Sequence, residues 1–280
     1  MKVLPFKIPK PEQEALVYQE DHEVVFYDQL HQHEEIQISF ILKGSGTLVV
    51  GDSINTYHKN DILVIGGNVP HVFKSDVEAS DMSIMYTLFF TKNAFGKEFF
   101  HISDMETAKD FFTNAAYGMK ISEDHKKIVK IFKKLQYQSK IERIASLLKI
   151  INQIIAIEHA PLSSFIYGKK YTDDEGKRMR AVFEHAMENY HNQITLEEVA
   201  DKANMTKNAF CRYFKKRTNK TFFQFLIEIR IENACKLLFR NKEMSIATVS
   251  ELCGFQNITN FNRKFKELKG ITPSQYRTQY

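Results

Sequence analysis

Residues 210–224 read FCRYFKKRTNKTFFQ, and residues 261–275 read FNRKFKELKGITPSQ. The two stretches start 51 positions apart and share residue types at matching places: Phe210, Arg212, Phe214, Lys215, Thr221 and Gln224 recur as Phe261, Arg263, Phe265, Lys266, Thr272 and Gln275. A short helical pattern precedes each copy. A helix, a tight turn and a basic helix are the parts of a helix-turn-helix unit. The repeat therefore predicts two such units in one chain.

Capping residues mark the helix boundaries of both units. In the first unit, Thr195 and Glu198 form a capping box, and Thr206 is placed to cap the second helix. In the second unit, Ser245 caps the first helix, and Gly254 supplies a turn residue that tolerates a left-handed backbone. The apolar positions of the second helices are expected to face inward: Phe210, Tyr213 and Phe214 in one, and Ile258, Phe261 and Phe265 in the other.

The opposite face of each second helix carries candidate DNA-binding side chains at helical spacing. They are Asn208, Cys211, Arg212 and Lys215 in the first unit, and Thr259, Asn262, Arg263 and Lys266 in the second. An asparagine amide can pair with adenine and an arginine fork with guanine, each worth about 1–3 kcal/mol of discrimination. The lysines, one turn later, suit phosphates. A single exposed arginine or lysine is usually only solvated, but the duplicated set favours DNA recognition.

Each unit is followed by a further capping box, Thr221 with Gln224 and Thr272 with Gln275. The first box starts a long apolar helix through Leu238, which would be a stiff strut between the units. Two recognition helices on one face of B-DNA should lie about 34 Å apart, one helical turn. A shorter separation would require the DNA to bend, at a cost on the order of 1–6 kcal/mol.

These segments together resemble the signature of the AraC/XylS family of bacterial transcription regulators. The matching positions, within about residues 178–278, are Arg230-x3-Ala234-x2-Leu237-Leu238, Ile246 to Gly254-Phe255, Phe261-x-Arg263-x-Phe265-Lys266 and Gly270-x-Thr272-Pro273-x2-Tyr276-Arg277. The resemblance implies that the recognition helices enter successive major grooves, with bases read from Asn208, Cys211, Arg212, Thr259, Asn262 and Arg263. The first copy departs from the family pattern at Cys211, a poor hydrogen-bonding residue, and at Asn219, where glycine is usual. We therefore expect two half-sites of different sequence.

The basic charge of the chain lies where the repeats lie. Of 39 Lys+Arg and 34 Asp+Glu in the chain, 19 and 13 lie in residues 171–280, which gives this stretch a net charge of +6. Residues 1–170 keep the remaining 20 and 21, a net charge of −1. Phosphate neutralisation would require this distribution, although a solvated basic face would also produce it.

Cysteine usage and hydropathy indicate a cytoplasmic protein. The three cysteines, Cys211, Cys235 and Cys253, are odd in number and lack metal-ligand spacing, which fits a reducing compartment. The apolar stretch near the N-terminus is broken by Pro5 and is far shorter than a signal-peptide core. The longest apolar-rich segment, residues 141–157, contains charged and amide side chains, so we expect a packed helix and no membrane contact.

Residues 1–104 are predicted to be mostly β, because short β-branched or aromatic runs alternate with turn signals. The expected strands are Val24–Tyr27, Ile36–Leu42, Thr47–Val50, Asp61–Ile65, His71–Phe73 and Ser83–Phe90. Their spacing is typical of a sandwich or a barrel. The pattern then becomes helical, first through Ile121, Ile128, Ile131 and Leu135 and then through residues 141–155. This predicts a helical hairpin that covers the β domain with part of its apolar stripe and meets a second subunit with the rest. The alternative is a hairpin that packs only on its own domain.

Three histidines and a glutamine stand out in the β region. His31, His33 and Gln37 share one strand parity, and His71 follows a glycine-rich turn. This set resembles the cupin barrel, in which a His-x-His-x3-Glu motif and a later histidine bind a metal. Because Gln37 occupies the glutamate place, the anionic ligand is missing, and we assign no metal or other cofactor. We expect the four side chains to line an effector pocket; a three-histidine metal site and histidines satisfied by hydrogen bonds within the barrel are the alternatives.

The predicted fold is α+β. It has a cupin-like β-barrel sensor over residues 1–104, a dimerising helical hairpin over residues 105–160, a linker over residues 161–177 and an all-α domain of two helix-turn-helix units over residues 178–280. AraC-type proteins commonly carry a cupin barrel and a dimerising helix pair before the DNA-binding domain, and this chain has that order.

The predicted function is sequence-specific DNA-binding transcription regulation, and not catalysis. We expect the partners to be double-stranded operator DNA, a small-molecule effector such as a sugar or another metabolite, and a second copy of the chain, with RNA polymerase as a further candidate. Two other functions fit the sequence. One is a metal-dependent cupin enzyme with an appended DNA-binding domain, and the other is an activator whose barrel dimerises but binds no ligand.

Overall fold

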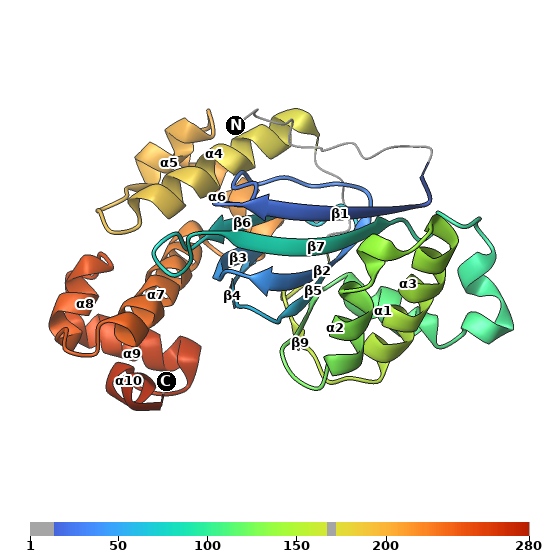
Figure 1. Ribbon diagram of the computed structural model, residues 1–280. Coiled ribbons are helices and arrows are strands. Elements are labelled where there is room, and N and C mark those ends of the chain that lie inside the picture. The colour runs from blue at the N-terminus through green and yellow to red at the C-terminus, as the bar shows by residue number, and fades with distance from the viewer. Residues whose placement is uncertain (1–13, 167–171, 280) are drawn as a thin grey trace. The chain divides into compact units, whose positions relative to one another are not determined.

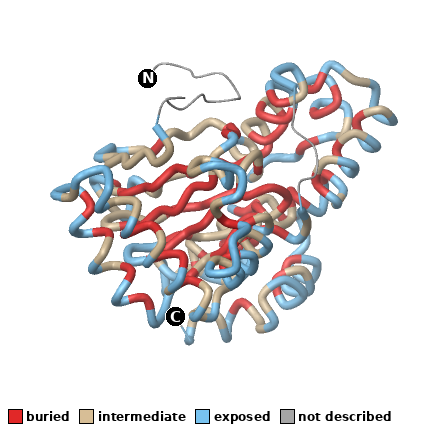
Figure 2. Tube along the Cα trace, turned by 90° about the vertical axis from the view of Figure 1, so that its right-hand side faces the viewer, coloured by how far each residue is buried: buried red, intermediate tan, exposed pale blue. Residues whose placement is uncertain are grey.

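Alternate residues of strand β2 (Ile36–Lys43) face two different cores, and this alternation organises the N-terminal unit. Ile36, Ile38 and Phe40 belong to one buried cluster, whereas Ile41 belongs to another. Every residue of β2 up to Ile41 is buried, as expected for a strand covered on both faces. Figure 2 shows the buried residues concentrated along such strands.

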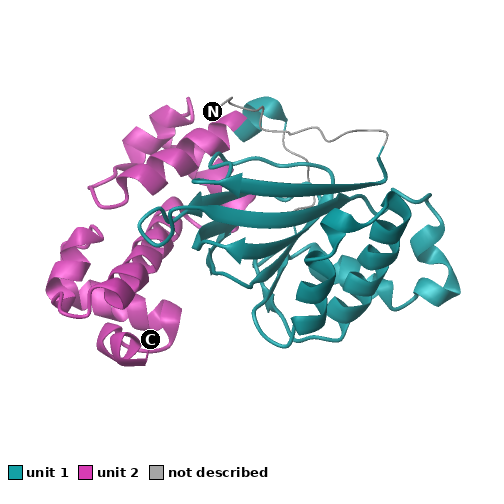
Figure 3. Ribbon diagram, in the orientation of Figure 1, with its two compact units in different colours: residues 1–176 teal, residues 177–280 magenta. Residues whose placement is uncertain are grey.

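The computed structural model describes residues 14–166 and 172–279. The chain divides into two units, residues 1–176 and residues 177–280 (Figure 3). The N-terminal apolar stretch and residues 167–171 of the expected linker lie outside the described residues. Among the residues that the structure describes, none of the helices combines the length and the apolar character needed to span a bilayer.

The strands of the N-terminal unit form two antiparallel sheets. A six-stranded sheet has the order β1-β7-β2-β5-β8-β9, and a three-stranded sheet has the order β4-β3-β6. Besides β2, the strands are β1 (Leu16–Glu23), β3 (Gly46–Val50), β4 (Ser53–Tyr57), β5 (Ile62–Ile65), β6 (His71–Ser75), β7 (Ser83–Phe90), β8 (Met119–Ile121) and β9 (Ala160–Pro161). The two sheets pack on each other through Leu48 and Phe73 of the small sheet and Leu63 and Met85 of the large one.

The predicted α+β class is confirmed, with antiparallel sheets in the N-terminal unit and helices in the C-terminal unit. The predicted closed barrel is not found in the described residues. A barrel needs its edge strands to pair, and here β1 and β9 end one sheet while β4 and β6 end the other. The sheets are held together by side-chain packing, and an isolated bridge joins His31 to His71 at the edge strand β6.

Four strands were not predicted from the sequence: the short strands β8 and β9, and the longer strands β1 and β4. The strand predicted at Val24–Tyr27 is wrong, since these residues are irregular and the strand β1 ends just before them. Strand β1 reads LVYQEDHE and is half-exposed, so it lacks a run of apolar residues. Strand β4 reads SINTY and also lacks a run of apolar residues. Both are sheet edges, where pairing with one neighbour decides the structure more than residue type does.

Helices α1 (Ala108–Ala115), α2 (Lys126–Phe132) and α3 (Lys140–Ile155) cover one face of the six-stranded sheet (Figure 1). They place Phe111, Phe132 and Leu147 in the same cluster as Phe40 of β2. Short 3-10 turns, η1 (Phe99–His101), η2 (Ser103–Met105) and η3 (Leu135–Tyr137), connect this layer. The hairpin is more interrupted than predicted, because Ile121 ends strand β8 and does not start a helix.

Part of the expected linker is fixed to the N-terminal unit. Strand β9 pairs with β8 at the sheet edge. The buried carboxylate of Asp52 accepts hydrogen bonds from the Ser163 hydroxyl (2.9 Å), the Ser164 backbone N–H (2.9 Å) and the Ser164 hydroxyl. Leu162 is buried in the cluster between the two sheets. The chain is therefore held by the β structure as far as Ser164.

The C-terminal unit is helical. Its helices are α4 (Asp173–Asn189), which begins shortly before the boundary, α5 (Leu196–Lys202), α6 (Lys207–Thr218), α7 (Phe222–Arg240), α8 (Ile246–Leu252), α9 (Ile258–Lys269) and α10 (Pro273–Gln279). The capping boxes predicted at Thr195, Thr221 and Thr272 are confirmed. Each threonine side chain accepts from the backbone N–H three residues ahead, and the side chain at that position accepts in return from the threonine N–H.

Helix α7 gives both helix-turn-helix units part of their core. In its N-terminal half, the Phe222 ring lies 5.6 Å from that of Phe214. In its C-terminal half, Leu238 belongs to a separate cluster with Phe261 and Phe265. At about 1.5 Å per residue, a helix of 19 residues is about 28 Å long, enough to separate the two cores. The long helix predicted from Thr221 is confirmed.

Candidate functional sites

Helices α6 and α9 are the second helices of the two units, and they begin and end in the same way. Thr206 caps α6 by accepting a hydrogen bond from the backbone N–H of Ala209, and Asn257 caps α9. Each helix ends at a residue in the left-handed conformation, Asn219 with φ 55° and Gly270 with φ 75°. Asn219, which stands where glycine is usual, thus takes the same left-handed conformation as Gly270 in the second copy.

The predicted DNA-binding side chains lie on the exposed surface of these two helices. The exposed residues include Asn208, Cys211, Arg212, Lys215, Thr259, Asn262, Arg263 and Lys266. The aromatic faces are fully buried, through Phe210 and Phe214 in α6 and Phe261 and Phe265 in α9. The prediction that Ile258 faces inward is wrong. It is 43% exposed, because it lies at the start of α9 before the buried stripe begins at Phe261.

Arg212 and Arg263, the two arginines predicted to contact bases, differ in their surroundings. Arg263 donates through Nη2 to Asn260 Oδ1 (2.8 Å), and its Nη1 lies 3.6 Å from Glu267 Oε2. Within the described residues, Arg212 has no such hydrogen bond or ion pair. The guanidinium of Arg263 is therefore held along its own helix, while that of Arg212 is not. Asn260 and Glu267 were not predicted, although their spacing of three and four residues from Arg263 was a usable signal.

The two helices also differ in charge. Helix α6 has three basic residues in its last turn, and α9 has two. Lys264 donates to Glu267 at 2.8 Å, and this hydrogen bond lowers the pKa of the exposed Glu267 carboxyl, so that α9 also carries a negative charge. Helix α6 therefore offers the stronger positive field to a phosphate backbone.

Arg230 of α7 connects segments of both helix-turn-helix units. Its Nε donates to the carbonyl of Tyr190 and its Nη2 to the carbonyl of Asn192, each at 2.8 Å. Its guanidinium also lies 5.8 Å from the ring centroid of Phe255. Phe255 follows Gly254, which has φ 79° and where a Cβ would lie 2.6 Å from the Tyr190 carbonyl oxygen. Arg230, which the sequence placed in the signature, thus ties the turn of the second unit to the loop after α4.

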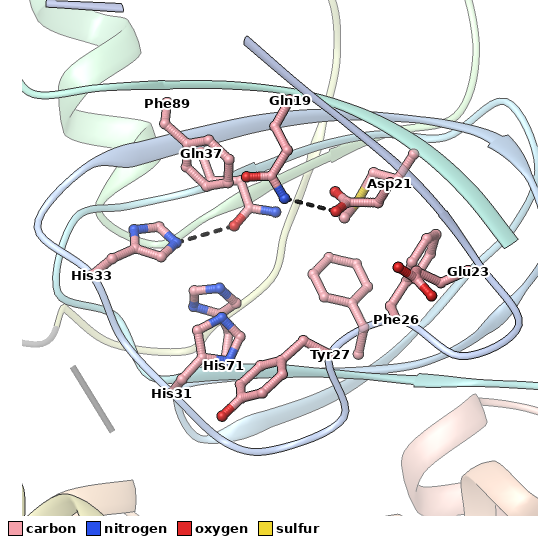
Figure 4. A pocket seen from close by; sticks show the side chains of 12 residues that line it. Gln19, Asp21, Glu23, Phe26, Tyr27, His31, His33, Gln37, His71 and Phe89 are labelled. Carbon is pink, nitrogen blue, oxygen red and sulfur yellow. Dashed lines mark hydrogen bonds between the residues drawn. The ribbon is translucent and has the colours of Figure 1, made fainter. Parts of the chain in front are cut away.

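A cavity of about 220 Å³ lies within the N-terminal unit (Figure 4). The four predicted effector-binding residues, His31, His33, Gln37 and His71, all line it. So do Gln19, Asp21 and Glu23, which the sequence analysis missed because it did not predict strand β1. Aromatic side chains form much of the remaining wall. The cavity therefore combines apolar surface with several converging polar groups, as ligand sites commonly do.

The three imidazoles gather at one end of the cavity, as Figure 4 shows. His31 and His71 are bridge partners, and their ring centroids lie 4.3 Å apart. The ring of His33 lies 4.9 Å from that of His71. One ring nitrogen from each histidine lies within 4.8 Å of the others, and in the described residues this is the group that could hold a metal ion.

Backbone carbonyls orient all three rings. The Nδ1–H of His31 donates to the Gln29 carbonyl (2.8 Å), that of His33 to the Glu35 carbonyl (2.9 Å) and that of His71 to the Val69 carbonyl (2.9 Å). Gln37 lies behind His33, with its Oε1 3.1 Å from His33 Nε2. A buried chain continues from Gln37 Nε2 to the Ser39 hydroxyl (2.8 Å) and on to the Thr87 hydroxyl (2.9 Å).

The C-terminal unit matches known proteins in sequence, and some relatives match nearly the whole chain. Residues 199–279 match a family of helix-turn-helix domains. The helix-turn-helix transcriptional regulator YdeC of Bacillus subtilis is 26% identical over 90% of this chain and 86% of its own length. The Msm operon regulatory protein of Streptococcus mutans is 21% identical over 86% of this chain and 84% of its own length. Among solved structures, the DNA-binding domain of AdpA in complex with a target DNA is 31% identical over 35% of this chain and 88% of that chain, with a TM-score of 0.34.

Proposed function

We propose that the chain is an AraC-type helix-turn-helix DNA-binding transcription regulator, and that it reads two neighbouring half-sites of one duplex under the control of a small molecule bound in the N-terminal unit. One observation carries the proposal. An arginine and a lysine recur at equivalent exposed positions of α6 and α9, Arg212 with Lys215 and Arg263 with Lys266. The relatives of comparable length carry names of regulators, which supports regulation over catalysis.

Each recognition helix offers side chains that suit base edges in the major groove. Arg212 and Arg263 can each donate two parallel hydrogen bonds to guanine O6 and N7, and Asn208 and Asn262 can pair with adenine. A good bidentate pair is worth about 1–3 kcal/mol against the wrong base. Thr259 and Cys211 are smaller and suit contact with a thymine methyl group.

The two half-sites are expected to differ in sequence and in contribution. Cys211 stands where the second copy has Asn262, so the two helices do not present the same donors. Arg263 must also exchange its contacts with Asn260 and Glu267 for contacts with a base, whereas Arg212 has none to give up among the described residues. The protein would therefore bind its operator in one direction.

Binding by the purified chain to a library of operator variants tests this reading. Arg212→Ala and Arg263→Ala should each relax the preference at a base position in a different half-site, by about 1–3 kcal/mol. Lys215→Ala is the matched control, since it should weaken binding to all sequences alike and lower the dependence on salt. If all three variants lose the same affinity for every operator sequence, Arg212 and Arg263 do not contact bases.

The cavity around His31, His33, Gln37 and His71 is the proposed effector site. It is enclosed by strands of both sheets, and Phe73 and Met85 belong both to its wall and to the core between the sheets. Leu162 lies in that same core, next to the Ser163 and Ser164 residues that Asp52 holds. A ligand that repacks this core could thus act on the segment that leads to the DNA-binding unit, provided that it binds one arrangement more tightly than the other.

Helix α3 is the proposed dimer contact. Its buried face, through Leu147 and Ile150, packs on the sheet, but Ile141 is 80% exposed at its first turn. Tyr137, just before the helix, is 82% exposed. Exposed apolar side chains that lie this close together are common at protein–protein contacts. A second copy of the chain is the occupant we propose, which would place two DNA-binding units on one operator.

A further inference from the structure

Two lysines, one at the end of each recognition helix, pair with glutamates in the middle of helix α7. The four residues make up what we call the α7 charge cluster: Lys220, Glu228, Glu232 and Lys269. We propose that this cluster fixes the position of α6 relative to α9, and so determines which spacing of the two half-sites the protein accepts. The inference rests on the proposed function, because spacing has a meaning only for a chain that reads two half-sites.

The two lysines come from different helix-turn-helix units. Lys220 directly follows Asn219, the left-handed residue that ends α6, and Lys269 is the last residue of α9. The repeat places Ile271 where the first copy has Lys220, and Thr218 where the second copy has Lys269. The two contacts with α7 are therefore not copies of each other, and comparison of the repeats could not predict them.

The two glutamates lie on the same face of α7. Glu228 and Glu232 are one helical turn apart, which is roughly 6 Å along the axis. Lys220 Nζ donates to both carboxylate oxygens of Glu228, at 2.8 and 2.9 Å. Lys269 Nζ donates to Oε1 of Glu232. One short stretch of α7 thus holds the ends of both recognition helices.

The two ion pairs also affect each other. Burial lowers the pKa of Lys269, but the carboxylates of Glu232 and Glu228 raise it, and the net shift is upward, so the ammonium group stays charged. Two glutamates four positions apart on a helix repel each other when they are unpaired. Each lysine therefore offsets a repulsion that involves the glutamate of the other pair. Loss of either lysine should weaken both contacts.

The α7 charge cluster is partly shielded from water. Its four side chains are only 12–24% exposed. By contrast, Lys207 and Glu197, which form an ion pair between α6 and α5 within the first unit, are 53% and 71% exposed. Exposed ion pairs contribute little, whereas removing one partner of a poorly solvated pair leaves a charge without compensation. The cluster can therefore hold a fixed geometry that the exposed pair cannot.

Half-site spacing is sensitive to this geometry because a duplex rotates as it advances. Moving one half-site by one base pair shifts it by about 3.4 Å and turns it by about 34–36° around the axis. Recognition helices that are held rigidly can follow only if the DNA deforms, which costs free energy. Recognition helices released from α7 can move instead. The cluster should therefore change the ratio of the affinities for two spacings.

The test compares the whole chain and its variants on two duplexes. The operator is first selected by the wild type from a randomised duplex library, and a second duplex has its half-sites moved apart by one base pair. We expect the wild type to bind the second duplex more weakly by on the order of tenfold, and Glu232→Gln by only about threefold. Removing a negative charge strengthens binding to both duplexes alike, so this effect cancels in the ratio.

Glu197→Gln is the matched control. It removes the same charge from the exposed pair within the first unit, and it should keep the wild-type ratio. If Glu232→Gln also keeps the wild-type ratio, or if Glu197→Gln lowers the ratio as much as Glu232→Gln does, the proposal is wrong.

Lys220→Gln keeps the test decisive if Glu232→Gln does not fold. It removes the lysine of the other unit from the same cluster, and it should lower the ratio to a similar degree. A wild-type ratio in Lys220→Gln would show that this lysine does not set the spacing, and would overturn the proposal.

Exchange of the charges separates pairing from packing. The double variant Glu232→Lys with Lys269→Glu should restore the wild-type ratio, since it keeps one positive and one negative partner at the end of α9. A double variant that tolerates the shifted duplex as well as the single variants do would show that packing, and not charge pairing, sets the spacing.

Failure of the proposed function would give a different result. A wild-type chain that selects one undivided site has no half-site spacing, which rejects both the reading of two half-sites and the role of the cluster. If the wild type discriminates between the two duplexes and the cluster variants do so equally, the proposed function stands and the role of the cluster alone is rejected.

Discussion

The backbones of His31 and His71 exchange two hydrogen bonds, of 3.1 and 2.9 Å, although the two residues are 40 positions apart. This bridge puts their imidazoles on one wall of the cavity, with centroids 4.3 Å apart. It also connects the segment before β2 to β6 of the small sheet. The proposed ligand site thus lies where the two sheets meet. A ligand bound there would change how the two sheets pack on each other.

Gly254→Ala should destabilise the C-terminal unit more than Gly270→Ala. Both glycines have a left-handed backbone, with φ of 79° and 75°, so both substitutions introduce strain of about 1–2 kcal/mol. At Gly254 the new Cβ would also lie 2.6 Å from the Tyr190 carbonyl oxygen, whereas at Gly270 nothing lies within 4 Å. Urea unfolding of the two variants measures the difference. Equal losses in the free energy of unfolding would show that the short distance to the Tyr190 carbonyl oxygen does not affect stability.

Glu267→Gln should strengthen DNA binding. The substitution removes a negative charge from the exposed face of α9 and releases Arg263 from a contact at 3.6 Å. Affinity for the operator should rise at low salt, and the gain should shrink as salt is added. Glu123→Gln, the same change at an exposed residue of the N-terminal unit, is the control and should leave affinity unchanged. A weaker operator complex with Glu267→Gln would instead show that Glu267 positions Arg263 for its base.

The three cysteines should differ sharply in reactivity. Burial raises the pKa of both the Cys235 and the Cys253 thiol to about 12, so near neutral pH the folded protein holds almost no reactive thiolate at these positions. Cys211 is exposed on α6. Iodoacetamide should therefore label Cys211 first, and operator DNA should protect it, as mass spectrometry of the labelled peptides would show. Labelling of Cys211 at the same rate with and without operator DNA would count against α6 as a recognition helix.

Ile141→Lys should disrupt the proposed dimer and leave the fold intact. Ile141 is 80% exposed, so the lysine side chain can reach water in the monomer at little cost, whereas in a dimer contact it would bury a charge. Sedimentation velocity should show a shift from dimer to monomer. Val77→Lys makes a similar change at another exposed apolar residue, 54% exposed, and should leave the assembly unchanged. A wild-type chain that sediments as a monomer at all concentrations would remove the basis of this prediction.

The helix-turn-helix pair could be predicted in detail because its signals are local. The capping boxes at Thr195, Thr221 and Thr272 join residues three positions apart, and all three form as predicted. The left-handed cap at Asn219 follows from its own side chain. Ile258 was misassigned, because periodicity gives the face of a residue but not where along the helix the core begins.

The N-terminal unit was predicted less well because its pairing is non-local. Strand β1 has too few apolar residues to be recognised, and it is a strand because β7 pairs with it residue by residue. With β1 unrecognised, Asp21 and Glu23 could not be placed in the pocket. The parity of His31, His33 and Gln37 was visible in the sequence, but whether His71 would meet them depended on how two sheets pack.

By itself, the sequence determined the α+β class, the two helix-turn-helix units and the exposed faces of α6 and α9, because helix formation depends on contacts within a few residues. Only the tertiary structure decided that the β strands form two open sheets, that Arg230 ties Tyr190 and Asn192 to α7, and that three imidazoles turn the same ring nitrogen away from the backbone. These features arise where segments distant in sequence meet, and no local pattern specifies which segments will do so.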